Sequence, residues 1–327
     1  MNYRNIADLN NIILQRLHVI PRDFDLIVGV PRSGMLPANL LALYLNRPYT
    51  DIHSFINGHI YKAGARGQFF DVKQYKKILV VDDSVASGSA LNEVKENLKE
   101  LEKQFDIKYC AIYVIPGKEK VVDYYFETVP LPRYFQWNIL NHSTLEKACF
   151  DIDGVLCVDP TPEQNDDGPK YRDFILNAAP LFIPGSKIGT IVTSRLEKYR
   201  TETETWLKKY NIRYNDLIML DLPDMAARQK ANSHGTHKAT AYMSKPYVLF
   251  VESEMFQALE INRISKKPVL CTANFEMIFK SESVMYNLKS GKYLPFLRKY
   301  ALKLRNKMRK MQGGSHKKLK LQHSSVK

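Results

Sequence analysis

Two pairs of aspartates, each placed after an apolar run, are the residues of this sequence best suited to chemistry. Asp82 and Asp83 follow the run Ile78 to Val81, and Asp151 and Asp153 stand two residues apart after a second such run. Carboxylates can accept hydrogen bonds from hydroxyl groups, bind a divalent cation or attack phosphorus. Residues two apart on a strand point to the same side. The second pair can therefore act together on one substrate.

The first pair leads into a small loop rich in hydroxyl groups. Residues Ser84 to Ser89 separate the apolar run, which predicts a buried parallel strand, from the amphipathic segment Leu91 to Leu101, which predicts a helix. Free N–H groups and the positive dipole end of a helix N-terminus favour a phosphate, and Gly88 lets the backbone approach it closely. Two carboxylates would repel that phosphate, so they are expected to hold hydroxyl groups or a divalent cation.

This stretch resembles the 5-phosphoribosyl 1-pyrophosphate (PRPP) signature of type I phosphoribosyltransferases. The resemblance rests on a hydrophobic strand, two acidic residues and the loop Ser87-Gly88-Ser89. It implies that the loop wraps the 5-phosphate of PRPP, and that Asp82 and Asp83 reach the ribose hydroxyls. The loop residues that it implies are Ser84, Ala86, Ser87, Gly88 and Ser89.

A second strand-loop-helix pattern precedes the first. Phe24 to Val30 predicts a strand, Leu36 to Leu45 predicts a helix, and the connection Pro31 to Met35 resembles the pyrophosphate loop of the same family. Its backbone N–H groups and one guanidinium suit a diphosphate. The residues expected to bind PRPP here are Arg32, Ser33 and Gly34.

Two further segments of the first domain have candidate roles. The glycine-bearing basic stretch Tyr61 to Gly67 resembles the family's lid over the pyrophosphate, with Lys62 and Arg66 as candidates and a solvated hairpin as the alternative. Trp137 lies where some purine phosphoribosyltransferases carry an aromatic residue at the acceptor pocket. We expect it to pack in the core, and stacking on an acceptor base or sugar is the alternative.

The second aspartate pair lies in Asp151-Ile152-Asp153-Gly154. This motif resembles the nucleophile motif of the haloacid dehalogenase (HAD) superfamily. Asp151 can attack phosphorus to give an aspartyl phosphate, while Asp153 protonates the leaving oxygen and later activates water. A phosphate dianion approaches two carboxylates only if a cation neutralises them. Mg²⁺ and a further acidic ligand are therefore expected.

The other motifs of the superfamily are matched in order along the chain. Thr193 matches the residue that hydrogen-bonds the phosphoryl group, and Ser194 is the alternative. Lys238 matches the lysine that offsets the charge of the aspartyl phosphate, and Lys230 and Lys245 compete for that role. The short separations between these motifs leave little room for a cap domain, so an open site is expected.

The acidic metal ligand departs from the superfamily pattern. Glu252 follows a predicted strand where aspartate is usual, and Glu254 is the alternative. The expected metal ligands are Asp151, Asp153 and Glu252. An inactive, degenerate site is the competing interpretation.

The whole chain is predicted to form two α/β domains, each with a parallel Rossmann-like sheet. With 327 residues and 45% hydrophobic content it can bury two cores. The expected bounds are 1–145 for the phosphoribosyltransferase-like domain, 146–277 for a capless HAD-like phosphatase domain and 278–327 for a basic tail. Four cysteines without metal spacing suggest buried thiols in a reducing cytoplasm. We find no signal peptide or membrane span, which predicts a cytoplasmic protein.

The net charge of +14 is concentrated in the tail. No acidic residue follows Glu282, and the stretch Tyr293 to Met308 mixes apolar and basic residues at helical spacing. This pattern predicts a helix that binds the inner face of the cytoplasmic membrane, with nucleic-acid contact and a solvated tail as the alternatives. Beyond Gln312 the tail is expected to be disordered.

The two motifs together suggest a bifunctional enzyme. Domain 1 would transfer 5-phosphoribosyl from PRPP to a glycan acceptor, which could be lipid-linked, and domain 2 would remove the 5-phosphate. This resembles the PRPP-dependent ribofuranosyltransferase and phosphatase systems of bacterial polysaccharide synthesis, and it does not favour a nucleic-acid partner. The alternatives are a nucleobase phosphoribosyltransferase fused to a nucleotide or sugar phosphatase, and a non-catalytic PRPP-sensing regulator that binds nucleic acid. The oligomeric state is left open.

Overall fold

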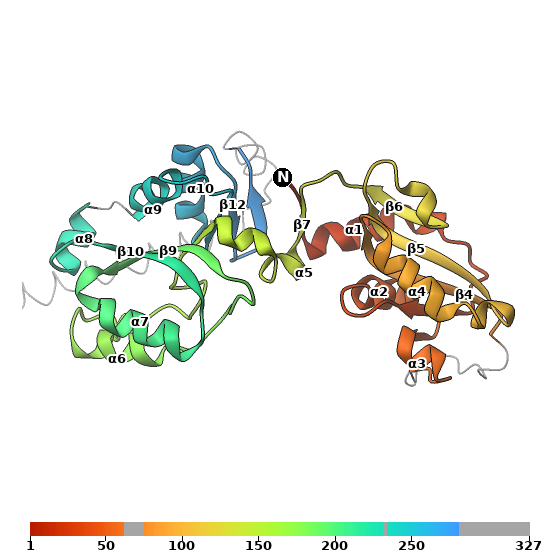
Figure 1. Ribbon diagram of the computed structural model, residues 1–327. Coiled ribbons are helices and arrows are strands. Elements are labelled where there is room, and N and C mark those ends of the chain that lie inside the picture. Colours follow the sequence, from red (N-terminus) through yellow and green to blue (C-terminus); the bar gives the residue numbers. More distant parts are fainter. Residues whose placement is uncertain (62–74, 232–233, 281–327) are drawn as a thin grey trace, which may run out of the picture. The chain divides into compact units, whose positions relative to one another are not determined.

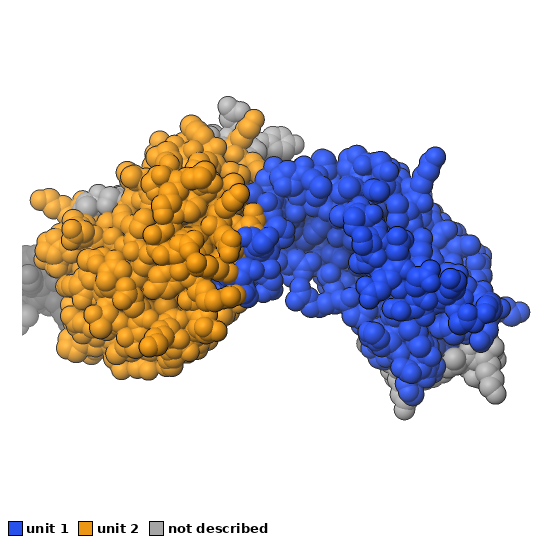
Figure 2. Space-filling view, viewed as in Figure 1, with its two compact units in different colours: residues 1–143, 184–186 blue, residues 144–183, 187–327 orange. Residues whose placement is uncertain are grey.

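The structure is a computed structural model that describes residues 1–61, 75–231 and 234–280. Its chain divides into two compact units, which Figure 2 distinguishes by colour. Unit 1 comprises residues 1–143 and 184–186, and unit 2 comprises residues 144–183 and 187–327. The sequence places the boundary at residue 145, and the segment 184–186 was not expected to return to unit 1. Each unit is an α/β layer structure with its own sheet (Figure 1).

The sheet of unit 1 has five parallel strands in the order β3-β2-β4-β5-β6. All-parallel pairing buries both faces, which explains the nearly continuous apolar runs of the central strands. The strands are β2 (Leu26–Gly29), β3 (Tyr49–Asp51), β4 (Lys77–Val85), β5 (Asp106–Val114) and β6 (Tyr124–Thr128).

Helices cover the two faces of this sheet with separate apolar clusters. Leu79 and Val81 of β4 pack in one cluster with residues of α1 (Ile6–Arg16) and α2 (Met35–Leu45). Ile78 and Val80 pack in the other cluster with residues of α3 (Ile52–Ile56) and α4 (Ser89–Leu98). Odd-numbered and even-numbered residues of β4 therefore face different helices, as the period of a strand requires.

A two-stranded parallel sheet closes unit 1. β1 (Asn2–Arg4) pairs with β7 (Arg133–Phe135), and the short helix α5 (Gln136–Ile139) follows β7 directly. The backbone N–H of Ile6 donates to the side chain of Gln136. The N-terminal segment of unit 1 is thus hydrogen-bonded to the segment of β7 and α5. The 3-10 turns of this unit are η1 (Leu17–Val19), η4 (Leu101–Lys103) and η5 (Glu119–Val121).

The sheet of unit 2 has six strands in the order β10-β9-β8-β11-β12-β13. All pairs are parallel except β12 with β13, which is antiparallel. The strands are β8 (Ala148–Phe150), β9 (Ile188–Leu196), β10 (Tyr214–Leu220), β11 (Leu249–Glu252), β12 (Val269–Cys271) and β13 (Glu276–Ile278).

Helices lie on both sides of this second sheet (Figure 1). Residues of α9 and α10 form one apolar cluster with β8, β11 and β12, and α6 packs against α7. The helices are α6 (Pro169–Asn177), α7 (Arg200–Lys209), α8 (Met225–Ala231), α9 (His234–Met243) and α10 (Met255–Ser265), with 3-10 turns η6 (Ser143–Lys147) and η7 (Glu197–Tyr199). The prediction of α/β architecture with parallel sheets is confirmed.

Two further sequence predictions can be compared with the described residues. All four cysteines are buried and unpaired, as expected. No helix in the described ranges is long and apolar enough to cross a membrane. The lid candidates Lys62 and Arg66 and the basic tail from residue 281 lie outside the described residues.

Candidate functional sites

The two predicted PRPP loops lie at the same edge of the unit 1 sheet. They follow β2 and β4, which are hydrogen-bonded neighbours, so their carboxyl ends meet. Gly34 packs against the backbone of β4: a Cβ at this position would lie 2.8 Å from the carbonyl oxygen of Val81 and 2.9 Å from Cα of Asp82. The first loop can approach the second this closely only with glycine at this position.

The second loop has the features of a phosphate cradle. β4 ends at Val85 and α4 begins at Ser89, so Ala86 to Gly88 form the turn between them. Gly88 has a φ of 93°, which favours glycine. Ala86, Ser87 and Ser89 are exposed, and the hydroxyl oxygens of the two serines lie 2.9 Å apart. Hydroxyl groups and the first N–H groups of α4 therefore face solvent together, which suits an anion.

Asp82 and Asp83 lie within β4, not after it as the sequence suggested. The strand continues to Val85 because it pairs with β5 as far as Val114. Adjacent strand residues point to opposite faces, but the carboxyl groups of Asp82 and Asp83 still interact through a hydrogen bond. Their role as a ribose-binding pair stays a prediction. Asp83 belongs to the face of Val81, which α1 and α2 cover.

Both carboxylate oxygens of Asp83 already have protein partners. Ser33 Oγ donates to Oδ1 at 2.9 Å, and Trp137 Nε1 donates to Oδ2 at 2.7 Å. Trp137 also stacks on Phe135, with ring centroids 5.0 Å apart. Ser33, predicted to bind PRPP, bonds to Asp83 through its hydroxyl group, and its contact with PRPP stays a prediction. Trp137 thus packs in the core and in addition fixes an acid, a contact that no sequence signal indicated.

Asp82 is the acidic residue left to meet a ligand. Burial, with the neighbouring Asp83 adding to it, raises the pKa of Asp82 to about 8. Arg133 of β7 opposes this shift weakly, and its Nη1 is buried without a hydrogen-bond partner among the described residues. Arg32 is exposed and donates to the side chain of Asn138 at 3.0 Å.

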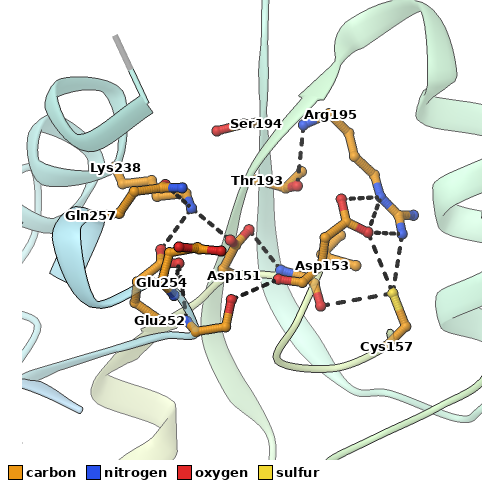
Figure 3. Close-up of polar contacts among 12 residues, drawn as sticks. Asp151, Asp153, Cys157, Thr193, Ser194, Arg195, Lys238, Glu252, Glu254 and Gln257 are labelled. Carbon is orange, nitrogen blue, oxygen red and sulfur yellow. Dashed lines mark hydrogen bonds and ion pairs between the residues drawn. The ribbon is translucent and has the colours of Figure 1, made fainter. Parts of the chain in front are cut away.

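The second site lies at the carboxyl edge of the unit 2 sheet. Asp151 follows β8, and Glu252 ends the neighbouring strand β11. Lys238, from α9, joins them: its Nζ lies 2.6 Å from Asp151 Oδ2, 2.6 Å from Glu252 Oε2 and 2.8 Å from Gln257 Oε1 (Figure 3). Lys238, Asp151 and Glu252, which are far apart in the sequence, are therefore brought together as predicted from the motifs. Gln257 of α10 was not foreseen.

The charged side chains of this cluster shift one another's pKa values. Burial raises the pKa of Asp151 to about 7; Glu252 and Asp153 add to this effect, and Lys238 opposes it. Burial opposes the charge of Lys238, but Asp151 and Glu252 raise the pKa of Lys238 above its usual value. The lysine is therefore a permanent cation. Its competitors are placed elsewhere: Lys230 is exposed on α8, and Lys245 pairs with Asp216 at 2.7 Å.

Asp153 is bound to a buried arginine. Arg195, which has no exposed surface, donates from Nη2 to Asp153 Oδ1 at 2.6 Å and from Nε to Oδ2 at 3.1 Å (Figure 3). Its Nη2 also lies 3.3 Å from Cys157 Sγ. β9 extends to Leu196 and carries the side chain of Arg195 inward.

The two candidates for the hydroxyl group of this site, Thr193 and Ser194, have different surroundings. Thr193 is fully buried, and its Oγ1 accepts a hydrogen bond from the backbone N–H of Arg195. Ser194 lines the cavity in front of Asp151, and its buried Oγ has no partner among the described residues. The geometry therefore favours Ser194, the alternative, over Thr193 as the hydroxyl that meets a phosphoryl group.

The three predicted metal ligands do not converge. No group of three His, Cys, Asp or Glu side chains in the described ranges is arranged to hold a metal ion. Asp153 turns toward Arg195, whereas Asp151 and Glu252 turn toward one common cation. Mg²⁺ commonly takes one or two protein carboxylates and completes its shell with water and substrate phosphate. Asp151 and Glu252 fit that smaller set, and the side chain of Asp153 does not.

Curated relatives of this chain carry a regulatory name. The chain is 34% identical over 98 residues to "Transcriptional regulator GfcR" of Methanocaldococcus jannaschii, which is 28% of this chain and 46% of that protein. It is 28% identical over 95 residues to the protein of the same name from Methanococcoides burtonii, covering 28% and 47% of the two chains. The chain thus spans about half the length of these relatives.

These relatives contradict one prediction. A bifunctional enzyme of polysaccharide synthesis, with PRPP as donor and a glycan as acceptor, is wrong, because the matching proteins are named as regulators. The motifs misled because a PRPP-binding loop is needed equally for transfer and for sensing.

Two solved structures and a family model match part of the chain. A purine phosphoribosyltransferase from Pyrococcus horikoshii matches with 24% identity and a TM-score of 0.29, covering 42% of this chain and 92% of that one. The Helicobacter pylori xanthine-guanine-hypoxanthine phosphoribosyltransferase matches with 19% identity and a TM-score of 0.33, covering 42% and 93%. The family model described as "Phosphoribosyl transferase domain" matches residues 2–143. That range lies within unit 1, so unit 1 is the part of the chain that is similar to this family.

Proposed function

We propose that this protein is a PRPP-binding regulator, in which unit 1 binds PRPP without transferring its phosphoribosyl group. The bonding of Asp83 carries this proposal. One oxygen accepts from Ser33 and the other from Trp137, so this acid is satisfied inside the protein. Asp82 alone would then meet the ribose, while the exposed loop before α4 would hold the 5-phosphate. This arrangement suits retention of a ligand better than turnover.

The relatives named as transcriptional regulators support the same proposal. Unit 1 is the part of the chain that the phosphoribosyltransferase family model covers. The sequence after Glu282 contains thirteen basic residues, counted as Lys289, Lys292, Arg298, Lys299, Lys303, Arg305, Lys307, Arg309, Lys310, Lys317, Lys318, Lys320 and Lys327, and no acidic residue. Such a composition attracts phosphate backbones in a salt-dependent way. We propose nucleic acid as the partner of this basic segment, in place of a membrane.

Binding and turnover are separated by two measurements on the full chain. Titration calorimetry with PRPP and Mg²⁺ is expected to show saturable binding. A pyrophosphate-release assay with orotate, adenine, guanine or hypoxanthine is expected to show no turnover above the protein-free rate. Binding together with steady release in the presence of any of these bases would refute the regulator and favour a nucleobase transferase. Absence of PRPP binding would refute both.

The affinity for PRPP is expected to rise about tenfold between about pH 7 and about pH 9. Because burial beside Asp83 raises the pKa of Asp82 to about 8, this carboxyl is mostly protonated at the lower pH. The carboxylate form accepts hydrogen bonds from ribose hydroxyls with both oxygens, so binding releases the proton and strengthens as the pH rises. Calorimetry at both pH values measures the change. Asp82→Asn cannot titrate and should abolish it; an unchanged pH dependence in this variant would contradict the role of Asp82.

We propose a second function for unit 2, the hydrolysis of a small phosphomonoester. It is supported by the cluster of Asp151, Lys238 and Glu252 at the end of β8 and by its resemblance to the HAD superfamily. Asp151 Oδ would attack phosphorus and displace the alcohol oxygen, giving an aspartyl phosphate. Lys238 holds the carboxylate of Asp151 in place. It also offsets the charge that develops on the phosphoryl oxygens.

The other residues of the site complete this chemistry. Ser194, which lines the cavity, would donate from its hydroxyl group to a phosphoryl oxygen. Asp153, oriented by Arg195, would give a proton to the leaving oxygen. It would then take a proton from the water that hydrolyses the intermediate. Mg²⁺ held by Asp151 and Glu252 would supply charge neutralisation for the phosphate dianion.

A further inference from the structure

The cavity of unit 2 extends beyond the residues that the proposed hydrolysis uses. Its volume is about 540 Å³, which lies in the range of small-molecule sites. Asp151, Lys238, Glu252 and Ser194 account for the phosphoryl end. The remaining lining includes Asn165, Tyr171, Arg228 and His234, and neither the motifs nor the relatives assign these four a role.

Arg228 is the notable member of this second group. It is half-buried on α8, and Nη1 donates only a long hydrogen bond, 3.3 Å, to the backbone carbonyl of Ser194. It interacts with the hydroxyl of Tyr171, which the same cavity exposes. No carboxylate in the described part of the chain forms an ion pair with it. A half-buried guanidinium with so few partners has donors to spare for a ligand.

The two cations that line the cavity, Lys238 and Arg228, differ in how far other residues already occupy them. Lys238 is fully committed to Asp151, Glu252 and Gln257. Among the lining residues that the structure describes, Arg228 is then the cation available to a ligand. Burial, together with Lys238 and Arg228, lowers the pKa of His234, so its imidazole is neutral and offers one donor and one acceptor.

We propose that Arg228, together with His234 and Tyr171, binds a second anionic group of the substrate. The substrate class is then a phosphomonoester that carries a second phosphate or a carboxylate in addition to the scissile phosphate. Arg228 suits either anion, because its fork of N–H groups matches both phosphate and carboxylate oxygens. This assignment rests on the proposed hydrolase function of unit 2 and gives that function its substrate class.

Matched substrate pairs test the proposal on the full chain with Mg²⁺. Ribulose 1,5-bisphosphate and ribulose 5-phosphate differ by one phosphate, and 3-phosphoglycerate and glycerol 3-phosphate differ by one carboxylate. In the unaltered protein kcat/KM is expected to be at least about tenfold higher for the doubly anionic member of one pair or both, as a charge-assisted hydrogen bond provides. Which pair shows the preference identifies the anion.

Two variants assign that preference to Arg228. Arg228→Gln is expected to reduce the ratio of kcat/KM within the preferred pair to near one. Lys230→Gln removes the same charge from an exposed position on the same helix and should leave the ratio as it was. Equal ratios in the two variants would overturn the proposal, as would the absence of a preference in the unaltered protein.

A failure of the hydrolase function is recognised separately. If the protein hydrolyses neither these substrates nor p-nitrophenyl phosphate, the proposed hydrolysis is refuted. Calorimetric binding of ribulose 1,5-bisphosphate and of 3-phosphoglycerate then decides the subsite. Binding that Arg228→Gln weakens at least about tenfold, and Lys230→Gln does not, supports it. Equal binding by both variants, or no binding, refutes it.

Discussion

Asp151→Asn is expected to lower the rate of p-nitrophenyl phosphate hydrolysis by at least about a thousandfold, the scale seen when a nucleophile is removed. An amide oxygen does not attack phosphorus, and the amide also breaks the ion pair with Lys238, which lies 2.6 Å away. The loss should appear in kcat and in kcat/KM alike, since the covalent step itself fails. Steady-state release of p-nitrophenol measures it.

A matched change separates chemistry from stability. Asp221→Asn makes the same replacement at an exposed residue just after β10 and should leave the rate unchanged. Circular dichroism of both variants establishes that unit 2 is folded. If Asp151→Asn retains more than about a tenth of the rate while it is folded, Asp151 is not the nucleophile.

Arg195→Met is expected to destabilise unit 2 by about 3–5 kcal/mol, the cost of leaving one partner of a buried ion pair alone. Asp153 is 20% exposed and has Arg195 as its ion-pair partner, so its carboxylate would be left largely desolvated without a cation. Urea unfolding followed by the fluorescence of Trp206, which is buried in unit 2, measures the change. A Trp137→Phe background removes the signal of unit 1.

Two comparisons make this result specific to the ion pair. Lys245→Met breaks a pair whose two side chains are 54% and 43% exposed, and it should cost less than about 1 kcal/mol. Adding Asp153→Asn to Arg195→Met should recover part of the loss, because no unpaired charge then remains. A cost of Arg195→Met no greater than that of Lys245→Met would show that the buried pair contributes little.

The sequence was most informative where a motif ends a strand. The apolar runs before Asp82 and Asp151 predicted central parallel strands, and both are central. Lys238 and Glu252 were assigned from motif order alone, and the fold brings both to Asp151. Local pattern suffices in such cases, because the carboxyl ends of parallel strands must meet at one edge of the sheet.

The sequence was least informative about where a strand stops. The sequence interpretation placed the acidic pair at the end of the apolar run and began the loop at Ser84, but pairing with β5 carries β4 to Val85, so the pair lies inside the strand. Contacts such as Trp137 with Asp83 join residues distant in sequence, so no local spacing indicates them.

The hydrogen bonds of Lys238 in unit 2 fix its side chain before a substrate binds. An ammonium group has three N–H donors, and in Lys238 the three are directed to Asp151, Glu252 and Gln257. The conformational entropy of this side chain is therefore lost when the protein folds, not when a substrate arrives. The ends of strands β8 and β11 and the helices α9 and α10 together position this side chain and its partners. A phosphate entering the cavity meets a cation that is already oriented, so the electrostatic part of the barrier is lowered by preorganisation rather than by motion during the reaction.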